Sequence, residues 1–278
     1  MSADDITESV DAAESAGTEP LPKPHAFRAI LRQEVRILRH VVDAIVVVLA
    51  MPLVLIPVLK GPIESGFAAE GEAINGAQFV VLGQAVLFGF FLVTYMGFAV
   101  FREHGWKTWD RLLVGPTSMG QILAGKLVPW MVIGAVQTAI IIAAGIIFWD
   151  LSLPASAIPG VALLTGSYMI FLAAFATLLI AFTDSIMLLQ ALANLSALVL
   201  GAIGGAMVPY VLLPDWIQVI SPVTPTYWIM RGYTDMLVRS DSWTVVLLPC
   251  GVVLAMAAVC ALLARLRFDP DEVKHFAE

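Results

Sequence analysis

The stretch from Gly120 to Lys126, GQILAGK, matches the first seven positions of a phosphate-binding loop. In such a loop backbone N–H groups surround the phosphates, and the lysine reaches them. The eighth position must carry a serine or threonine whose hydroxyl holds magnesium, but Leu127 stands there. No strand pattern precedes the motif, and an apolar segment follows it at once. We therefore expect no cofactor in this chain and no hydrolysis of ATP by it alone.

Residue types for other chemistry are scattered through the sequence. No His and Cys cluster has the spacing of metal ligands. Cys250 and Cys260 lie ten positions apart in one apolar segment, about 15 Å along a helix, which is too far for a disulfide. Asp184, Asp215 and Asp235 are isolated from one another. This pattern argues against a membrane enzyme, which needs clustered acids, histidines or a nucleophile.

The Gly120–Lys126 stretch closes a charged loop, residues 102–126, that separates two long apolar segments. Six charged residues fall in this loop, although only 13% of the 278 residues are charged and 59% are hydrophobic. Soluble domains carry about 25% charged residues, and apolar runs of 18 or more residues are typical of membrane helices. The sequence therefore predicts an all-α integral membrane protein in which the 102–126 loop lies in water.

Six apolar segments have the length of a membrane span. Each must be helical, because an isolated strand leaves its backbone unpaired in lipid. We predict transmembrane helices at residues 41–59, 78–101, 127–149, 159–182, 186–208 and 244–264.

The ends of the chain differ in character from the spans. Residues 1–24 are acidic and rich in Ser, Ala, Gly and Pro, as disordered tails are. Residues 25–40 predict an amphipathic interfacial helix with Arg28, Arg32 and Arg36 on one face. This helix is either a plain anchor or also one wall of a partner's docking site. Residues 265–278 form a second tail.

Basic residues set the expected orientation. Twelve of the fifteen precede the first span, lie in the 102–126 loop, or follow the last span. The positive-inside rule places these segments in the cytoplasm. We therefore expect a multi-pass protein of the cell (plasma) membrane with both termini cytoplasmic. The segment 208–243, cut by four prolines and rich in aromatic residues, predicts short extracellular re-entrant helices between the fifth and sixth spans.

Charged residues are nearly absent from the spans, which argues against an ion-coupled carrier, because such carriers place carboxylates or histidines in mid-membrane. Uncharged polar residues do occur there, and they either line a substrate path or hydrogen-bond between helices. The candidates for a substrate path are Gln84, Thr94, Tyr95, Gln137, Gln190 and Asn194.

The 102–126 loop resembles the cytoplasmic loop of ABC-2-type permeases, the membrane subunits of certain ATP-driven exporters. Their pattern is an acid, then Gly-Thr-Leu-Glu-Arg-Leu, then Pro, then Gly-Lys before the third span. Here Glu103 is the acid, residues 108–113 read TWDRLL, and Pro116 and Gly125-Lys126 follow. Lys107 replaces the usual Gly and Trp109 the usual Leu. Residues 204–231 are also similar to that family. The similarity lies in Gly204-Gly205, Pro209, LPDW at residues 213–216, Ser221-Pro222, TPTY at residues 224–227, and Arg231.

The resemblance implies that two permease subunits, as a homodimer or with a paralogue, pair with two ABC ATP-binding subunits that hold ATP and magnesium. The loop would then contain a coupling helix set in a groove of the ATPase, with membrane lipids beside it and no role for nucleic acid. Hydrophobic loop residues would lie partly in headgroups and partly in the partner, with polar contacts at the rim. The implied coupling residues are Glu103, Trp106, Lys107, Thr108, Trp109, Asp110, Arg111, Leu112 and Leu113.

The cargo is open within this family. A drug or lipid-like amphiphile is favoured, since a polymer channel requires an aqueous or aromatic-lined path. Apart from Phe88, Phe90, Phe91 and Tyr95, the spans are poor in aromatic residues on any one face. Export of a polysaccharide or another cell-envelope polymer is the alternative, and an ion-coupled carrier or membrane enzyme is the second. A solvated 102–126 loop without any partner is the plain interpretation of that segment.

Overall fold

The computed structural model describes residues 23–39, 42–70, 76–115, 117–149, 151–236, 243–267 and 274, and its regular structure there is helical throughout. The predicted acidic tail, apart from its last two positions, and most of the C-terminal tail lie outside these residues. The all-α prediction is confirmed for the part of the chain that the structure describes.

Six helices in the described residues are long and apolar enough to cross a membrane, as the sequence predicts. Each satisfies its backbone N–H and C=O groups internally, which the hydrocarbon region demands. They are α3 (Val42–Glu70), α4 (Gly76–Gly105), α6 (Met119–Phe148), α7 (Ile158–Phe182), α8 (Ile186–Ile203) and α11 (Leu247–Arg267).

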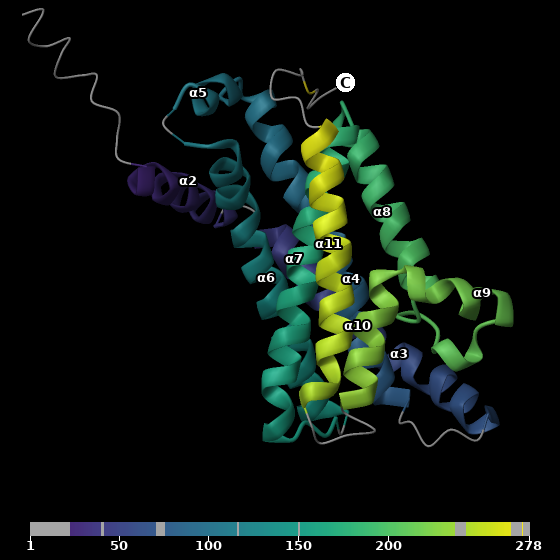
Figure 1. The fold of residues 1–278 in the computed structure, drawn as a ribbon. Coiled ribbons are helices and arrows are strands. Elements are labelled where there is room, and N and C mark those ends of the chain that lie inside the picture. The colour runs from purple at the N-terminus through teal and green to yellow at the C-terminus, as the bar shows by residue number, and fades with distance from the viewer. Residues whose placement is uncertain are drawn as a thin grey trace, which may run out of the picture.

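Helix α4 runs through the centre of the bundle, with α3, α6, α7 and α8 packed around it (Figure 1). In its most apolar 18-residue stretch 89% of the residues are buried, against 17% in α3. Any displacement at the end of α4 therefore reaches side chains of several spans. Helix α11 packs along α7 on one side of this core.

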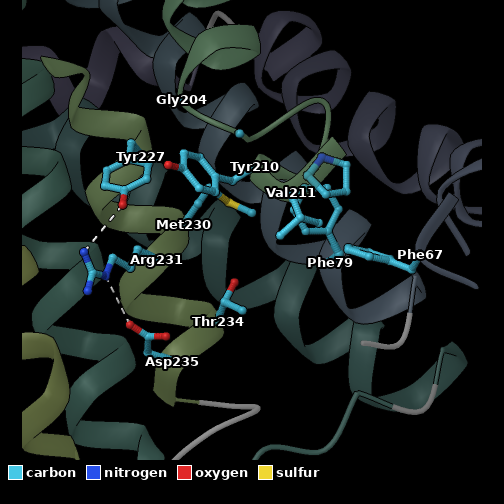
Figure 2. Close-up of a pocket in the computed structure, with 12 residues that line it drawn as sticks. Phe67, Phe79, Gly204, Tyr210, Val211, Tyr227, Met230, Arg231, Thr234 and Asp235 are labelled. Atoms are coloured by element: carbon cyan, nitrogen blue, oxygen red, sulfur yellow. Dashed lines mark hydrogen bonds and ion pairs between the residues drawn. The ribbon is translucent and has the colours of Figure 1, made fainter. Parts of the chain in front are cut away.

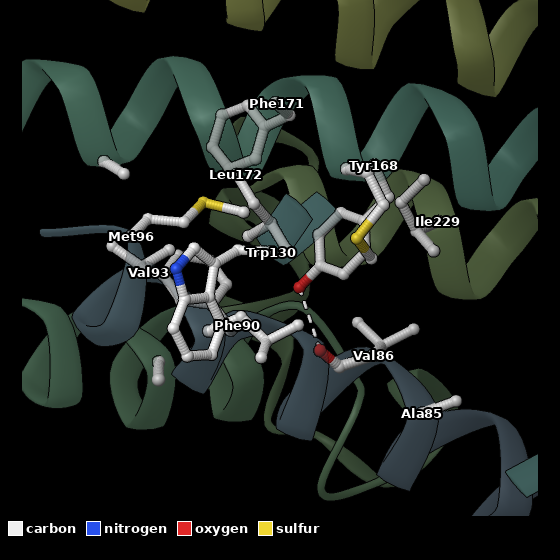
Figure 3. Packing of buried hydrophobic residues seen from close by; sticks show 14 of the residues in the cluster. Ala85, Val86, Phe90, Val93, Met96, Trp130, Tyr168, Phe171, Leu172 and Ile229 are labelled. Carbon is white, nitrogen blue, oxygen red and sulfur yellow. Dashed lines mark hydrogen bonds between the residues drawn. The ribbon is translucent and has the colours of Figure 1, made fainter. Parts of the chain in front are cut away.

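The core between α4 and α7 is aromatic and tightly packed (Figure 3). Phe90 of α4 lies edge-on to Phe175, with ring centroids 5.5 Å apart. The Tyr168 hydroxyl of α7 donates a hydrogen bond of 2.9 Å to the Val86 carbonyl, which pairs the polar end of a buried ring. Trp130 of α6 joins the same cluster from the other side.

The helix ends differ from the predicted span limits. Helix α3 continues eleven positions past residue 59, to Glu70, and contains Pro52, Pro57 and Pro62. Membrane helices tolerate proline because neighbouring groups satisfy the freed backbone. Helix α6 starts eight residues before the predicted span, at a capping box formed by Ser118 and Gln121.

Helix α8 ends at Ile203, five residues before the predicted limit of its span. Gly205, with φ of +82°, turns the chain in a conformation that side-chain-bearing residues rarely adopt. The turn is held by Ser221, whose hydroxyl donates to the Ile203 carbonyl at 2.7 Å. The chain then forms short helices η2 (Tyr210–Leu212), α9 (Asp215–Ile220), η3 (Ser221–Val223) and α10 (Pro225–Thr234).

The remaining elements lie at the two ends of the bundle. Helix α2 (Lys23–Leu38) packs across α6, while α5 (Trp109–Leu113) lies in the 102–126 loop at the same end (Figure 1). Lys274 belongs to this end too, since its ammonium donates to the Thr183 carbonyl at 2.9 Å in the α7–α8 turn. The last turns of α3, with α9 and α10, lie toward the opposite end. Short 3₁₀ segments η1 (Ala155–Ala157) and η5 (Trp243–Val246) precede α7 and α11.

Candidate functional site: the 102–126 loop and its buried ion pairs

The 102–126 loop starts as the last turn of α4 and ends inside the first turns of α6. Between them the backbone makes one sharp turn at Lys107, whose φ is +55°. This left-handed conformation favours glycine, and it falls at the position where the ABC-2 pattern has Gly. The turn closes through Thr108, whose amide donates to the Glu103 carbonyl at 2.9 Å.

Three buried charged side chains and the half-buried Arg102 join this loop to helix α2. The Lys126 ammonium lies 2.7 Å from a Glu103 carboxylate oxygen and 2.8 Å from a Glu34 carboxylate oxygen. The Arg102 guanidinium donates to both oxygens of Glu34, at 2.9 and 2.8 Å. The Thr108 hydroxyl adds a hydrogen bond to the Glu103 carboxylate. We call Glu34, Arg102, Glu103 and Lys126 the buried tetrad; it joins α2, α4 and α6.

The tetrad is electrically balanced, with two carboxylates and two cations. Glu34, Glu103 and Lys126 are each 1% exposed, so their charges are removed from water. A buried charge is tolerated only when it is paired and hydrogen-bonded. Loss of any one member leaves this group of side chains with an unbalanced charge, at a cost of about 3–5 kcal/mol where the charge that loses its partner is fully buried. The geometry thus holds the three helices in a fixed relation.

Lys126 is also the last residue of the stretch 120–126 that resembles a phosphate-binding loop. Its ammonium is enclosed by two carboxylates at ion-pair distance and is 1% exposed. A phosphate would have to displace both carboxylates to reach it. The residues of this stretch make packing contacts instead. Gly125 lets α2 approach α6, since a Cβ there would lie 2.7 Å from the Ile30 side chain.

Besides the exposed Val114, the solvent side of the loop carries polar side chains and one aromatic ring. Trp106 is 53% exposed and lies under the Arg102 guanidinium, 5.1 Å from its carbon to the ring centroid. Lys107, Asp110 and Arg111 are exposed beside it. These four residues, Trp106, Lys107, Asp110 and Arg111, form the exposed loop face that a partner could contact.

Two residues expected at the partner surface lie inside the chain instead. Glu103 is held in the tetrad, so it cannot make polar contacts at an interface rim. Trp109 is 4% exposed and stacks on His104, with ring centroids 4.6 Å apart. Leu112 and Leu113 are half-buried and pack against the core. The reason is that the apolar residues of α5 pack against the end of the bundle, while Glu103 lies in α4 and pairs with Lys126.

Glu34 was not anticipated from the sequence. The predicted helix 25–40 was oriented by its arginines, and Arg28, Arg32 and Arg36 are indeed exposed. The side that packs on α6 carries Ile30 and Glu34, both buried. A signal was present, because residues 30, 34 and 38 recur every four positions and place a carboxylate in an apolar row.

The six polar candidates for a substrate path do not share one cavity in this protomer. Thr94 of α4 donates a hydrogen bond of 3.3 Å to Asn194 of α8, as expected for helix–helix contacts. Tyr95 stacks on Trp130, with centroids 5.1 Å apart. Gln190 is exposed on α8.

The remaining two candidates are buried glutamines with unpaired carbonyl oxygens. Gln137 donates to the Val48 carbonyl at 3.3 Å. Among the described residues, no donor reaches the side-chain oxygen of Gln84 or that of Gln137. Buried unpaired oxygens are costly, which leaves both residues as candidates for a path that opens in another conformation.

Comparison with known proteins gives two matches and one negative result. The family described as "ABC-2 family transporter protein" matches residues 43–266. The linearmycin resistance permease protein LnrN of Bacillus subtilis (strain 168) is 26% identical over 200 residues, which are 70% of this chain and 49% of that protein. The chain thus spans about half the length of this curated relative. No solved structure matches.

Proposed function

This chain belongs to the ABC-2 family of transporter proteins, and on that basis we propose that it is the permease subunit of an ATP-driven exporter. A separate ABC ATP-binding subunit would hydrolyse ATP with magnesium, and the permease would convert the movement of that subunit into alternating access. The observation that carries the proposal is the buried tetrad, which ties an exposed loop to the central span.

The physical argument is one of stiffness. An exposed loop on a flexible tether would absorb a partner's movement without passing it on. Here Arg102 and Glu103 lie in the last turn of α4, and Lys126 lies in α6. The ion pairs of Lys126 with Glu103 and Glu34, at 2.7 and 2.8 Å, are buried, and the Arg102–Glu34 pair of 2.8 Å is partly buried. A push on the exposed loop face would therefore move α2, α4 and α6 together.

The proposed orientation places the loop in the cytoplasm. Helix α2, the loop and Lys274 lie at one end of the bundle and carry most of the basic residues. Lys60 and Arg231 lie toward the other end. This distribution follows the positive-inside rule and puts the exposed loop face where an ATP-binding subunit is available.

The proposed cargo is a drug or lipid-like amphiphile. The Bacillus subtilis relative is by name a resistance permease, which supports export of a harmful compound. A second permease copy would pack against this one. Exposed Gln190 on the outer side of α8 supports such a contact, because a polar side chain facing lipid is unfavourable.

Charge reversal on the exposed loop face tests the proposal. The Lys107→Glu/Arg111→Glu variant, co-expressed with the ATP-binding subunit, should lose at least tenfold in co-purified partner and in ATPase activity in lipid. Arg265→Glu is the matched control, since Arg265 is exposed at the same end but outside the loop. Equal recovery of the partner with both variants would refute docking at this face.

A further inference from the structure

A cavity lies toward the other end of the bundle from the 102–126 loop. It has a volume of about 330 Å³ and lies between the end of α3, the start of α4, residues 204–211 and helix α10 (Figure 2). Small-molecule pockets typically measure about 300–1,000 Å³. None of the six polar candidates for a substrate path lines it.

The walls of this cavity are apolar and aromatic. Phe67 of α3 and Phe79 of α4 meet edge to face at one side, with ring centroids 5.6 Å apart. Met230 and Val211 line the cavity in Figure 2. Tyr210 completes the wall beside Tyr227, with centroids 5.3 Å apart. Such walls fit a hydrocarbon chain or another extended apolar group.

Most polar side chains of the cavity come from α10 and the residue that follows it, and Thr234 is one of them. Figure 2 shows Tyr227, Arg231 and Asp235 one turn apart, with Arg231 in the middle. The Arg231 guanidinium reaches the Tyr227 hydroxyl at 3.5 Å through Nη1, and Asp235 at 3.4 Å through Nε. Its other terminal nitrogen, Nη2, has no hydrogen-bond partner among the described residues.

These contacts of Arg231 are weak enough to yield to a ligand. Both distances are at the long limit for a hydrogen bond, and the side chain of Arg231 is 47% exposed. Exposed ion pairs of this kind contribute little to stability. A guanidinium with a free edge beside an apolar cavity is suited to bidentate binding of a phosphate or carboxylate.

We propose that this cavity binds an amphiphile with an anionic head group. Its apolar chain would lie between Phe67, Phe79 and Met230, and its phosphate or carboxylate would bind the free edge of Arg231. The belt of Tyr and Trp side chains around α10 is typical of a membrane–water interface, where such a molecule has its head group. Two sources share this chemistry: a phospholipid of the outer leaflet, or an exported cargo on its way out.

Binding at this site does not depend on the function proposed above, although a role in export would rest on it. The test therefore uses the purified permease alone, without an ATP-binding subunit. The probes are dodecyl phosphate and dodecanol, which share a chain and differ in the anion, titrated in dodecyl maltoside micelles. We expect the dissociation constant for dodecyl phosphate to be at least tenfold lower than that for dodecanol.

Four variants locate the site. Arg231→Gln should abolish the preference for the phosphate, whereas Lys60→Gln should keep it, because Lys60 is an exposed cation toward the same end but outside the cavity. Val211→Trp, made at a residue that is 38% exposed, should fill the cavity and weaken binding of both probes at least tenfold. Asp235→Asn should leave the phosphate preference intact or raise it, since it removes a competing carboxylate.

The proposal is overturned if Arg231→Gln binds both probes as the wild type does, or if a folded Val211→Trp variant does. Mass spectrometry of co-purified lipid then separates the two sources. A phospholipid retained by the wild type and lost from Arg231→Gln supports the site with lipid as its occupant. Wild-type protein free of phospholipid that still prefers dodecyl phosphate supports the site with an exchangeable amphiphile. A phospholipid retained equally by both, and not displaced by dodecyl phosphate, contradicts it.

Discussion

Lys107 holds a backbone conformation that is unfavourable for its own side chain. Its φ of +55° costs a residue with a Cβ about 1–2 kcal/mol, and the ABC-2 pattern has glycine at this position. The turn is nevertheless required, because it brings Thr108 back onto Glu103. The lysine is tolerated here since its side chain is exposed and its charge lies on the exposed loop face.

Replacing Lys107 with glycine should therefore stabilise the protein. We expect Lys107→Gly to gain about 1 kcal/mol and to raise the Tm in detergent by roughly 2 °C or more. Arg111→Gly is the control, since Arg111 lies in helix α5, where glycine costs about 0.5–1 kcal/mol. A Lys107→Gly variant that melts below the wild type would show that the turn does not carry this strain.

The tetrad makes a second prediction at the residue scale. Lys126→Met should lower the free energy of unfolding by about 3–5 kcal/mol, because Glu103 loses its cation and Glu34 keeps only Arg102. Adding Glu103→Gln removes the unpaired charge, so the double variant should melt at a higher temperature than Lys126→Met alone. Independent, additive losses in the two variants would contradict a shared buried network.

The charged loop was predictable from the sequence, but which of its charged side chains are buried was not. Exposed Lys107, Asp110 and Arg111 follow from their position in an aqueous loop. Burial of Glu103 does not, since it depends on Lys126, which is 23 positions away, and on Glu34, which is 69 positions away. A carboxylate on an amphipathic helix is usually exposed, and only the packing of α2 on α6 makes Glu34 an exception.

At the scale of elements, the number of spans was predictable and several of their ends were not. An apolar run has to be helical in lipid. The helix itself, however, can begin or end at a capping residue or a glycine, which hydropathy does not reveal. Ser118 starts α6 before the apolar run, and Gly205 ends α8 within one. Gly201 and Gly205 have the GxxxG spacing that is common at helix–helix contacts, and Gly201 packs on Leu87 within the chain.

A larger side chain at the junction of α8 with α10 should disturb the packing there. A Cβ on Gly204 would lie 1.8 Å from the Thr226 hydroxyl oxygen, so Gly204→Ala should destabilise the protein by about 1–3 kcal/mol or more. Gly166→Ala is the matched control in α7, because no atom lies within 4 Å of its new Cβ and alanine favours the helix. Thermal melting compares them, and equal melting temperatures would contradict the close contact.

At the scale of the whole molecule, the two proposed binding surfaces lie at opposite ends of the bundle. The 102–126 loop presents Trp106, Lys107, Asp110 and Arg111 at one end, and the cavity on α10 opens toward the other. Helix α4 connects them, because it begins at the cavity with Phe79 and ends in the tetrad with Glu103. Membrane insertion and basic-residue asymmetry were readable from the sequence, whereas this connection required the tertiary packing.

The most direct test of the account is covalent capture of the ATP-binding subunit at the exposed loop face. Benzoylphenylalanine would replace Arg111 in the full chain, co-expressed with that subunit, and ultraviolet light would be applied to intact membranes. We predict a crosslinked product that contains both subunits with the photoprobe at position 111 and not at position 265. A crosslink from position 265 with none from position 111 would contradict docking at the loop, and so would the absence of any crosslink in membranes that contain both proteins.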